Sequence, residues 1–352
     1  LGAVAATGVE HGEDVALLAE ADRRGLGLST FVSAGNRADV SGNDLLQYWQ
    51  DDPGTDVILL YLETFGNPRK FARLTRRIGR TKPVVALASG AGSTAPVEQG
   101  PDAAAVTRLF ARSGVIRVDT VAEMFDVGTL LANQPLPVGR RVAVVGNSSA
   151  LTTLAAAACR AQRLTVAADY PRTVAPEAGA HEFADALADA AVDAAVDALV
   201  VVFAPPLPNQ LADEDADFTS ALASVALAGD KPTVATLLVG QPPAGVPTYP
   251  SVEESVRALA RVADYADWLR EPPGTVPDPA GIDPAAAGAA LTVDPVAPVD
   301  LHRVDDPRGR RSHLHGAPGG HEAIVGFGMD RGGEAQGETG DAKVNHGSSR
   351  GR

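Results

Sequence analysis

The segment VILLYL, residues 57–62, is apolar at every position. A strand without a polar face has to be covered on both sides, which is typical of a central strand in a parallel sheet flanked by helices. On both sides of this segment, apolar runs with strand character alternate with amphipathic stretches. They predict helices at 14–24, 43–49, 68–77 and 103–112, and strands at 30–33, 57–62 and 84–87. This alternation predicts βαβ units and an α/β fold.

A second copy of the same pattern follows the Pro-containing linker at 133–139. It predicts strands at 141–145, 198–203 and 233–239, and helices at 150–161 and 252–269. Ser251 and Glu254 have the spacing of a capping box at the start of the last helix. We therefore predict two three-layer parallel-sheet domains, residues 1–133 and 140–270, that meet across a cleft.

The remaining residues, 271–352, have a different composition. The first part is rich in Pro and Ala, and residues 302–352 hold five of the seven histidines and 12 of the 36 glycines with almost no apolar periodicity. We predict a linker followed by a disordered tail. His313 and His315 could bind a metal, but two histidines in a Gly- and Arg-rich tail are more often incidental, so no metal site is predicted.

Composition narrows the classes of function. The 352 residues carry 44 acidic and 30 basic side chains, a net charge of −14, which disfavours nucleic acid and anionic lipid as partners. The single cysteine, Cys159, lies in an apolar helical pattern and reads as helix core. No apolar run could span a membrane and no signal peptide is recognised, so we expect a cytoplasmic protein. The chain opens inside what reads as a strand, without methionine, so we expect a truncated product.

Several strings resemble the NDP-forming acyl-CoA synthetases, the family of succinyl-CoA synthetase and ADP-forming acetate–CoA ligase. They are VILLYLETFGNPRKF (57–71), SGVIRVDTVAEMFD (113–126), VDALVVVFAPPLP (196–208) and DKPTVATLLVG (230–240). Together the matching stretches cover about two-thirds of the chain, and they are most similar to the ligase region of actinobacterial fusions with a GNAT acetyltransferase. The resemblance implies that both predicted domains are flavodoxin-like.

In that family an acyl-CoA, phosphate and a nucleoside diphosphate are converted into acid, CoA and nucleoside triphosphate through a phosphohistidine. The resemblance implies that Glu63, at a strand end, orients the histidine, although a carboxylate there can also be a helix cap or a solvated charge. It further implies that Asn36 and the amides of Gly146, Asn147 and Ser148 approach the phosphate. CoA and ATP or ADP are cofactors of the full-length family, and none is expected in this chain alone.

The sequence departs from the family where the chemistry should occur. Thr94 falls at the position of the histidine, and no histidine occurs between His11 and His181. A threonine hydroxyl does not offer the neutral nitrogen nucleophile that accepts and returns a phosphoryl group. The helix that should receive the phosphate begins with Glu10, Glu13 and Asp14, whose charges repel a phosphate.

Whole domains of the family are also missing. Nothing in the sequence resembles the CoA-binding domain, the ATP-grasp domain or a GNAT acetyl-CoA loop, so we expect these as partner domains or subunits, and an oligomer is possible. We therefore predict a ligase fragment that is either catalytically inactive or regulatory. In the regulatory case it would sense acyl-CoA within an acetyltransferase fusion. The alternatives are an active acid–thiol ligase subunit partnered with a separate ATP-grasp chain, and a sugar- or nucleotide-binding flavodoxin-like module.

Overall fold

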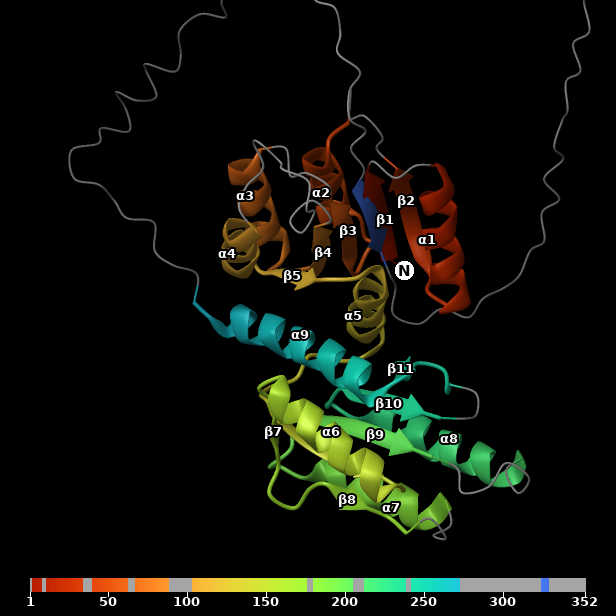
Figure 1. Ribbon diagram of the computed structural model, residues 1–352. Helices are drawn as coiled ribbons and strands as arrows, with labels where there is room; N and C mark the ends of the chain where they lie inside the picture. The colour runs from red at the N-terminus through yellow and green to blue at the C-terminus, as the bar shows by residue number, and fades with distance from the viewer. Residues whose placement is uncertain are drawn as a thin grey trace, which may run out of the picture. The chain divides into compact units, whose positions relative to one another are not determined.

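The computed structural model describes residues 2–7, 11–33, 40–62, 67–88, 103–175, 180–204, 212–238, 242–272 and 324–328. Two sheets with parallel pairing follow one another along the chain (Figure 1). Both belong to one compact unit. The chain passes from the first sheet to the second through the predicted linker, after helix α5 ends at Asn133 and before strand β6 begins at Arg141.

The first sheet contains five parallel strands in the order β2-β1-β3-β4-β5. This is the flavodoxin-like order. The strands are β1 (Gly2–Thr7), β2 (Leu28–Ser33), β3 (Ile58–Leu62), β4 (Val84–Ala88) and β5 (Val115–Val118). The five helices that follow them are α1 (His11–Arg23), α2 (Gly42–Asp51), α3 (Pro68–Ile78), α4 (Ala103–Ser113) and α5 (Val121–Asn133).

Strand β3 shows why this sheet forms. Successive side chains in a strand point to opposite faces, and here Ile58, Leu60 and Leu62 pack with α2, α3 and α4 in one apolar cluster. Leu59 points the other way, into the cluster that contains residues of α1 and α5. Both faces are therefore covered by helices, as the apolar segment VILLYL predicts.

The second sheet repeats this architecture. Its strands are β6 (Arg141–Gly146), β7 (Thr165–Val166), β8 (Arg172–Thr173), β9 (Ala198–Phe203), β10 (Thr233–Leu237) and β11 (Thr248–Tyr249). Their order is β11-β10-β9-β6-β7, and β8 pairs with the end of β6. The helices are α6 (Ser149–Ala161), α7 (Ala180–Val192), α8 (Ala212–Ala228) and α9 (Val252–Arg270). With β7 and β8 taken as one interrupted edge strand, this is again the flavodoxin-like order.

Helices α5 and α9 join the two sheets. A single cluster of buried apolar residues extends from β3, β4 and β5 through both helices to β6, β9 and β10. Polar contacts add to it, because the Tyr265 hydroxyl of α9 donates to the Gly79 carbonyl at 2.7 Å. The buried linker residue Gln134 donates its side-chain amide to the Gly245 carbonyl at 2.9 Å and accepts from the Thr233 amide at 2.9 Å. The sheets therefore share one core.

The α/β fold class with flavodoxin-like parallel sheets is confirmed. Helices α1, α2, α3, α4, α6 and α9 differ from their predicted bounds by three residues or fewer, whereas no bounds were predicted for α5, α7 and α8. The Ser251–Glu254 cap is also present, since the Glu254 amide donates to the Ser251 hydroxyl at 3.2 Å. One segment differs. Residues of the predicted disordered tail form β12 (Ile324–Gly328), which pairs antiparallel with β1 and β3. A five-residue segment that contains two glycines, Ile-Val-Gly-Phe-Gly, is too short to give a clear periodic signal. The rest of the tail lies outside the described residues.

Candidate functional site

The candidate site lies at the two points where the strand order reverses. In flavodoxin-like sheets, ligands bind beyond the carboxyl ends of the strands at this switch point. Here it falls between β1 and β3 in the first sheet, where β12 also pairs with both strands, and between β6 and β9 in the second. The segment Gly146-Asn147-Ser148 spans the carboxyl end of β6 and the start of α6, so the sequence prediction falls on the switch point of the second sheet.

Asn147 ties the ends of β6 and β9 together. Its side-chain oxygen accepts from the Ala204 amide at 2.8 Å, and its side-chain nitrogen donates to the Ala204 carbonyl at 2.7 Å. Its backbone amide donates to the Val202 carbonyl at 3.3 Å. The side chain and the backbone amide of Asn147 therefore both form hydrogen bonds at the ends of β6 and β9, so neither is available to bind a phosphate.

Gly146 allows this close approach. A Cβ atom added there would lie 2.7 Å from the Val202 carbonyl oxygen and 2.6 Å from Cγ2 of Thr152. Ser148, the next predicted residue, is the N-cap of α6, and its side chain makes no capping hydrogen bond. The amides at this helix start are therefore not satisfied by a side-chain cap, which leaves the end of α6 able to receive an anion.

The predicted residues of the first sheet are Asn36, Glu63 and Thr94, and all three lie outside the described residues. Their places in the chain are nevertheless fixed by the neighbouring strands. Asn36 follows β2, Glu63 directly follows Leu62 at the end of β3, and Thr94 lies between β4 and α4. Each is therefore in a connection that follows the carboxyl end of a strand. Their approach to one another, and to the residues of the second sheet, stays a prediction.

We expect Asn147→Ala to lower the free energy of unfolding by about 2–3 kcal/mol, because it leaves the amide and carbonyl of Ala204 without their partner. Asn147→Asp has nearly the same size but would place a carboxylate oxygen against the Ala204 carbonyl, so we expect a loss at least as large. Urea unfolding of the full chain measures both. Ser148→Ala is the control and should be within about 0.5 kcal/mol of the parent. Equal losses at Asn147 and Ser148 would contradict this role.

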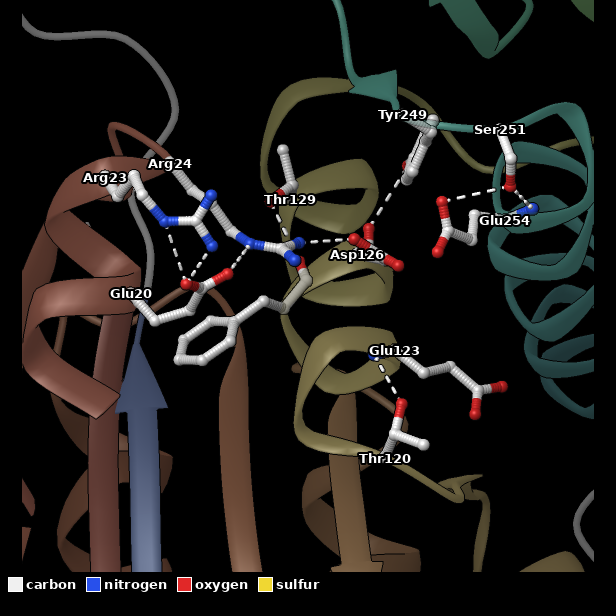
Figure 2. Close-up of polar contacts among 11 residues, drawn as sticks. Glu20, Arg23, Arg24, Thr120, Glu123, Asp126, Thr129, Tyr249, Ser251 and Glu254 are labelled. Atoms are coloured by element: carbon white, nitrogen blue, oxygen red, sulfur yellow. Dashed lines mark hydrogen bonds and ion pairs between the residues drawn. The ribbon is translucent and has the colours of Figure 1, made fainter. Parts of the chain in front are cut away.

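A partly buried polar cluster, formed by α1 and α5 with one contact from the second sheet, was not predicted from the sequence (Figure 2). Arg24, which follows the end of α1, lies between Glu20 of the same helix and Asp126 of α5. Its Nε donates to Glu20 at 2.6 Å, and its Nη1 donates to Asp126. From the second sheet, the buried Tyr249 hydroxyl donates to the Asp126 backbone carbonyl at 3.1 Å.

Burial and neighbouring charges shift the pKa values of the two acids in this cluster, Asp126 and Glu20. Burial raises the pKa of Asp126 above its ordinary value, against the lowering effect of the hydrogen bond from Arg24. Burial also acts to raise the pKa of Glu20, but hydrogen bonds from Arg23 and Arg24 outweigh it and lower that pKa. A buried acid with a raised pKa is a marker of function. In this cluster, however, every charged group has a partner, which is typical of a structural ion pair.

A second ion pair, between Arg141 and Asp197, lies at the amino ends of strands β6 and β9 in the second sheet. The Asp197 carboxylate accepts from the Arg141 guanidinium at 2.7 and 3.0 Å and from the Arg141 amide at 2.8 Å. It lies so close to Gly139 that an added Cβ there would be 2.4 Å from its Oδ2 atom. The hydrogen bond from Arg141 lowers the pKa of Asp197 below its ordinary value.

This shift predicts a pH dependence. Because the pKa of Asp197 is lower in the folded chain than in the unfolded one, its ionised form contributes stability above the unfolded pKa of about 4. That contribution is lost as the pH falls through the folded pKa. We therefore expect Asp197→Asn to destabilise the chain strongly at pH 7 and much less near pH 3, in urea unfolding at a series of pH values. Asp230→Asn, at an exposed turn, should show no such difference. A loss at Asp197 that does not vary with pH would contradict the assignment.

Other sequence predictions concern reactive groups. Cys159 is buried, and burial raises the pKa of its thiol to about 12, which fits helix core and opposes a nucleophilic role. Within the described ranges, no group of three or more His, Cys, Asp or Glu side chains could hold a metal ion. In the same part of the chain, no helix has both the length and the apolar character needed to cross a membrane.

Residues 14–131 match the family model described as a succinyl-CoA ligase like flavodoxin domain. The α subunit of ADP-forming acetate–CoA ligase I from Pyrococcus furiosus is 32% identical over 151 residues, which cover 40% of this chain and 32% of the relative. The ADP-forming 4-hydroxybutyrate–CoA ligase from Nitrosopumilus maritimus is 26% identical over 296 residues, which cover 74% of this chain and 42% of the relative. The chain thus spans less than half the length of these relatives.

A solved structure agrees with the fold. The dinucleotide forming acetyl-coenzyme A synthetase 1 of Ca. Korarchaeum cryptofilum, in complex with phosphate and ADP, superposes with a TM-score of 0.64 at 22% identity and covers 74% of this chain and 64% of that chain. The first sheet therefore lies in a succinyl-CoA ligase-like domain with homology to ADP-forming acetate–CoA ligases. The relatives named here are ligases, and they lend no support to the predicted fusion with a GNAT acetyltransferase.

Proposed function

We propose that this chain, which contains a succinyl-CoA ligase-like domain, supplies the two flavodoxin-like domains of an ADP-forming acyl-CoA ligase and does not itself carry the phosphoryl group. The observation that supports this most is the distribution of histidines. None occurs between His11 and His181, a range that includes the carboxyl ends of β2 to β6. Thr94 takes the position at which the resemblance implies the phosphohistidine.

The two histidines that flank this range, His11 and His181, do not substitute for it. The side chain of His181, in the first turn of α7, is 89% exposed and its Nδ1 lies 3.0 Å from an Asp185 carboxylate oxygen one turn along the helix. An exposed imidazole in water lacks the closed surroundings that stabilise a transferring phosphoryl group. His11 is followed in the sequence by Glu13 and Asp14, and we expect this acidic composition to disfavour a phosphate there.

The missing parts of the reaction must come from elsewhere. We propose that CoA and ATP or ADP bind to separate CoA-binding and ATP-grasp domains or subunits, and that the complex works in the cytoplasm. The curated relatives from Pyrococcus furiosus, which are named as α subunits, fit such a division of the ligase. A regulatory role, in which the chain senses acyl-CoA within an acetyltransferase fusion, makes the same prediction for Thr94.

One observation favours a second candidate, an active acid–thiol ligase subunit with a separate ATP-grasp chain. The N-terminus of α6 follows a switch point, and the side chain of its N-cap Ser148 makes no capping hydrogen bond. A helix start of this kind can bind phosphate. It supplies electrostatic stabilisation but no nucleophile, so the first proposal is preferred.

A reconstitution assay tests the proposal. The chain is mixed with the nucleotide-binding subunit of a related ADP-forming acetate–CoA ligase, and acyl-CoA formation from acid, CoA and ATP is measured by chromatography. We expect no product from the parent chain and none from Thr94→His, because the acidic start of α1 would still disfavour the phosphate. The related α subunit serves as the positive control. Product from Thr94→His alone would show that the nucleophile is the only deficit, and product from the parent chain would overturn the proposal.

A further inference from the structure

Helices α3 and α4 lie side by side on one face of the first sheet (Figure 1). Residues of both helices line an open groove of about 580 Å³. Four arginines line it, Arg73 and Arg76 from α3, and Arg108 and Arg112 from α4. All four are exposed. Among the described residues none of them has an ion pair or a hydrogen-bond partner for its guanidinium group. The groove thus concentrates four arginines that have no acidic partner among the described residues, on a chain whose net charge is −14.

The clustering of these arginines does not contribute to the stability of the fold. Arg73 and Arg76 are three residues apart on α3, and Arg108 and Arg112 are four apart on α4. Like charges at these spacings destabilise a helix by about 0.2–0.5 kcal/mol per pair. Exposed helix surfaces usually offset such pairs with acidic residues, yet neither α3 nor α4 contains Asp or Glu. The charges therefore oppose folding and would be neutralised by a bound anion.

The groove is also preformed. Below the arginines, the buried rings of Phe71 and Phe110 pack with centroids 5.9 Å apart and fix the spacing of the two helices. The small side chains of Ala72 and Ala105 leave the space between the helices open. A volume of 580 Å³ lies within the range of about 300–1,000 Å³ that is typical of small-molecule sites.

We propose that this groove is a binding site for a small anion with several phosphate groups. Guanidinium groups bind phosphate oxygens through paired, charge-assisted hydrogen bonds. Two arginines on each side can hold two or more phosphates at once. Helices α3 and α4 each follow a strand of the parallel sheet and run back along it. Arg76 and Arg112, near the ends of these helices, therefore lie away from the carboxyl ends of the strands. The site is separate from the switch points and does not depend on the proposed function.

Isothermal titration of the full chain with inorganic tripolyphosphate at 150 mM NaCl tests the proposal. We expect saturable binding of one ligand per chain, and each of Arg76→Ala and Arg108→Ala should weaken it about tenfold. Arg160→Ala, an exposed arginine on α6, is the matched control and should bind as the parent does. Parallel titrations with ATP and CoA distinguish a nucleotide from a simple polyphosphate, because an organic part that contributes contacts tightens binding.

Stability provides the second measurement. Since the arginines repel one another, Arg76→Ala and Arg108→Ala should keep or slightly raise the thermal midpoint without ligand, so weaker binding would not reflect unfolding. The proposal is overturned by an absence of saturable binding, or by equal losses in Arg160→Ala and the groove variants. It is also overturned if a polyglutamate peptide binds the groove more tightly than tripolyphosphate, because the surface would then be a site for an acidic protein.

Discussion

Replacing Arg24 with alanine is expected to lower the free energy of unfolding by about 3–5 kcal/mol. The side chain of its partner Asp126 is only 8% exposed, so the substitution leaves an acid buried without its cation. Since burial already raises the pKa of Asp126, removal of Arg24 should raise it further. An acid whose folded pKa lies above the unfolded one destabilises the chain at high pH and is relieved as it is protonated. The loss should therefore be larger at pH 7 than at pH 4.5, as measured by urea unfolding.

Arg23 provides a matched control for this prediction. It binds the same Glu20, but its side chain is 72% exposed, so Arg23→Ala should cost no more than about 1 kcal/mol. The double variant Arg24→Ala/Asp126→Ala should lose less than the sum of the two single losses, because both lose the same ion pair. Equal losses at Arg23 and Arg24, or additive single losses, would show that the buried Arg24–Asp126 pair does not stabilise the packing of α1 against α5.

The second large effect is expected for Gly114→Ala, at about 2–5 kcal/mol. Gly114 has a φ of +72°, and an added Cβ would lie 2.5 Å from ring carbons of Trp268 on α9. A left-handed conformation costs about 1–2 kcal/mol for a residue with a Cβ, and overpacking costs about 1–3 kcal/mol more. The ring cannot easily retreat, because the Arg80 guanidinium lies over it at 4.2 Å from the centroid. Urea unfolding of the variant measures the loss.

Gly25 is a control that separates the cost of the left-handed backbone conformation from the cost of overpacking. Its φ is +65°, but no atom lies within 4 Å of an added Cβ, so Gly25→Ala should show only the conformational cost of about 1–2 kcal/mol. Trp268→Leu should reduce the additional cost of Gly114→Ala, because the smaller side chain removes the clash. A loss at Gly114 no greater than that at Gly25 would mean that α9 does not pack tightly on the first sheet.

The parallel sheets could be predicted from local patterns because each strand and helix carries its own periodicity. The segment VILLYL required cover on both faces, and alternate residues of β3 indeed enter two different apolar clusters. The long-range contacts, both between helices of the first sheet and between the two sheets, could not be predicted in this way. Arg24 and Asp126 are 102 residues apart, and Tyr265 lies 186 residues from Gly79. No local pattern specifies which arginine meets which acid over such separations.

The candidate site could likewise be predicted only in part, because its position follows from local patterns but its long-range contacts do not. The segment Gly146-Asn147-Ser148 was predicted from the family resemblance together with its position after a strand, and it lies at the switch point of the second sheet. The role of Asn147 was not foreseen, because its partner is the backbone of Ala204, which has no side-chain signature. Asn36, Glu63 and Thr94 rest on the family resemblance, and their roles stay predictions.

Transfer of label from γ-labelled ATP to the purified chain, in the presence of the nucleotide-binding subunit of a related ligase, tests the central claim most directly. A phosphohistidine is stable to base and labile to acid, so the labelled chain can be assayed under both conditions. We predict no such label on the parent chain, while the related α subunit takes it up in the same mixture. Label that survives base and is lost in acid, and that disappears in His11→Asn or His181→Asn, would contradict the claim that this chain does not carry the phosphoryl group.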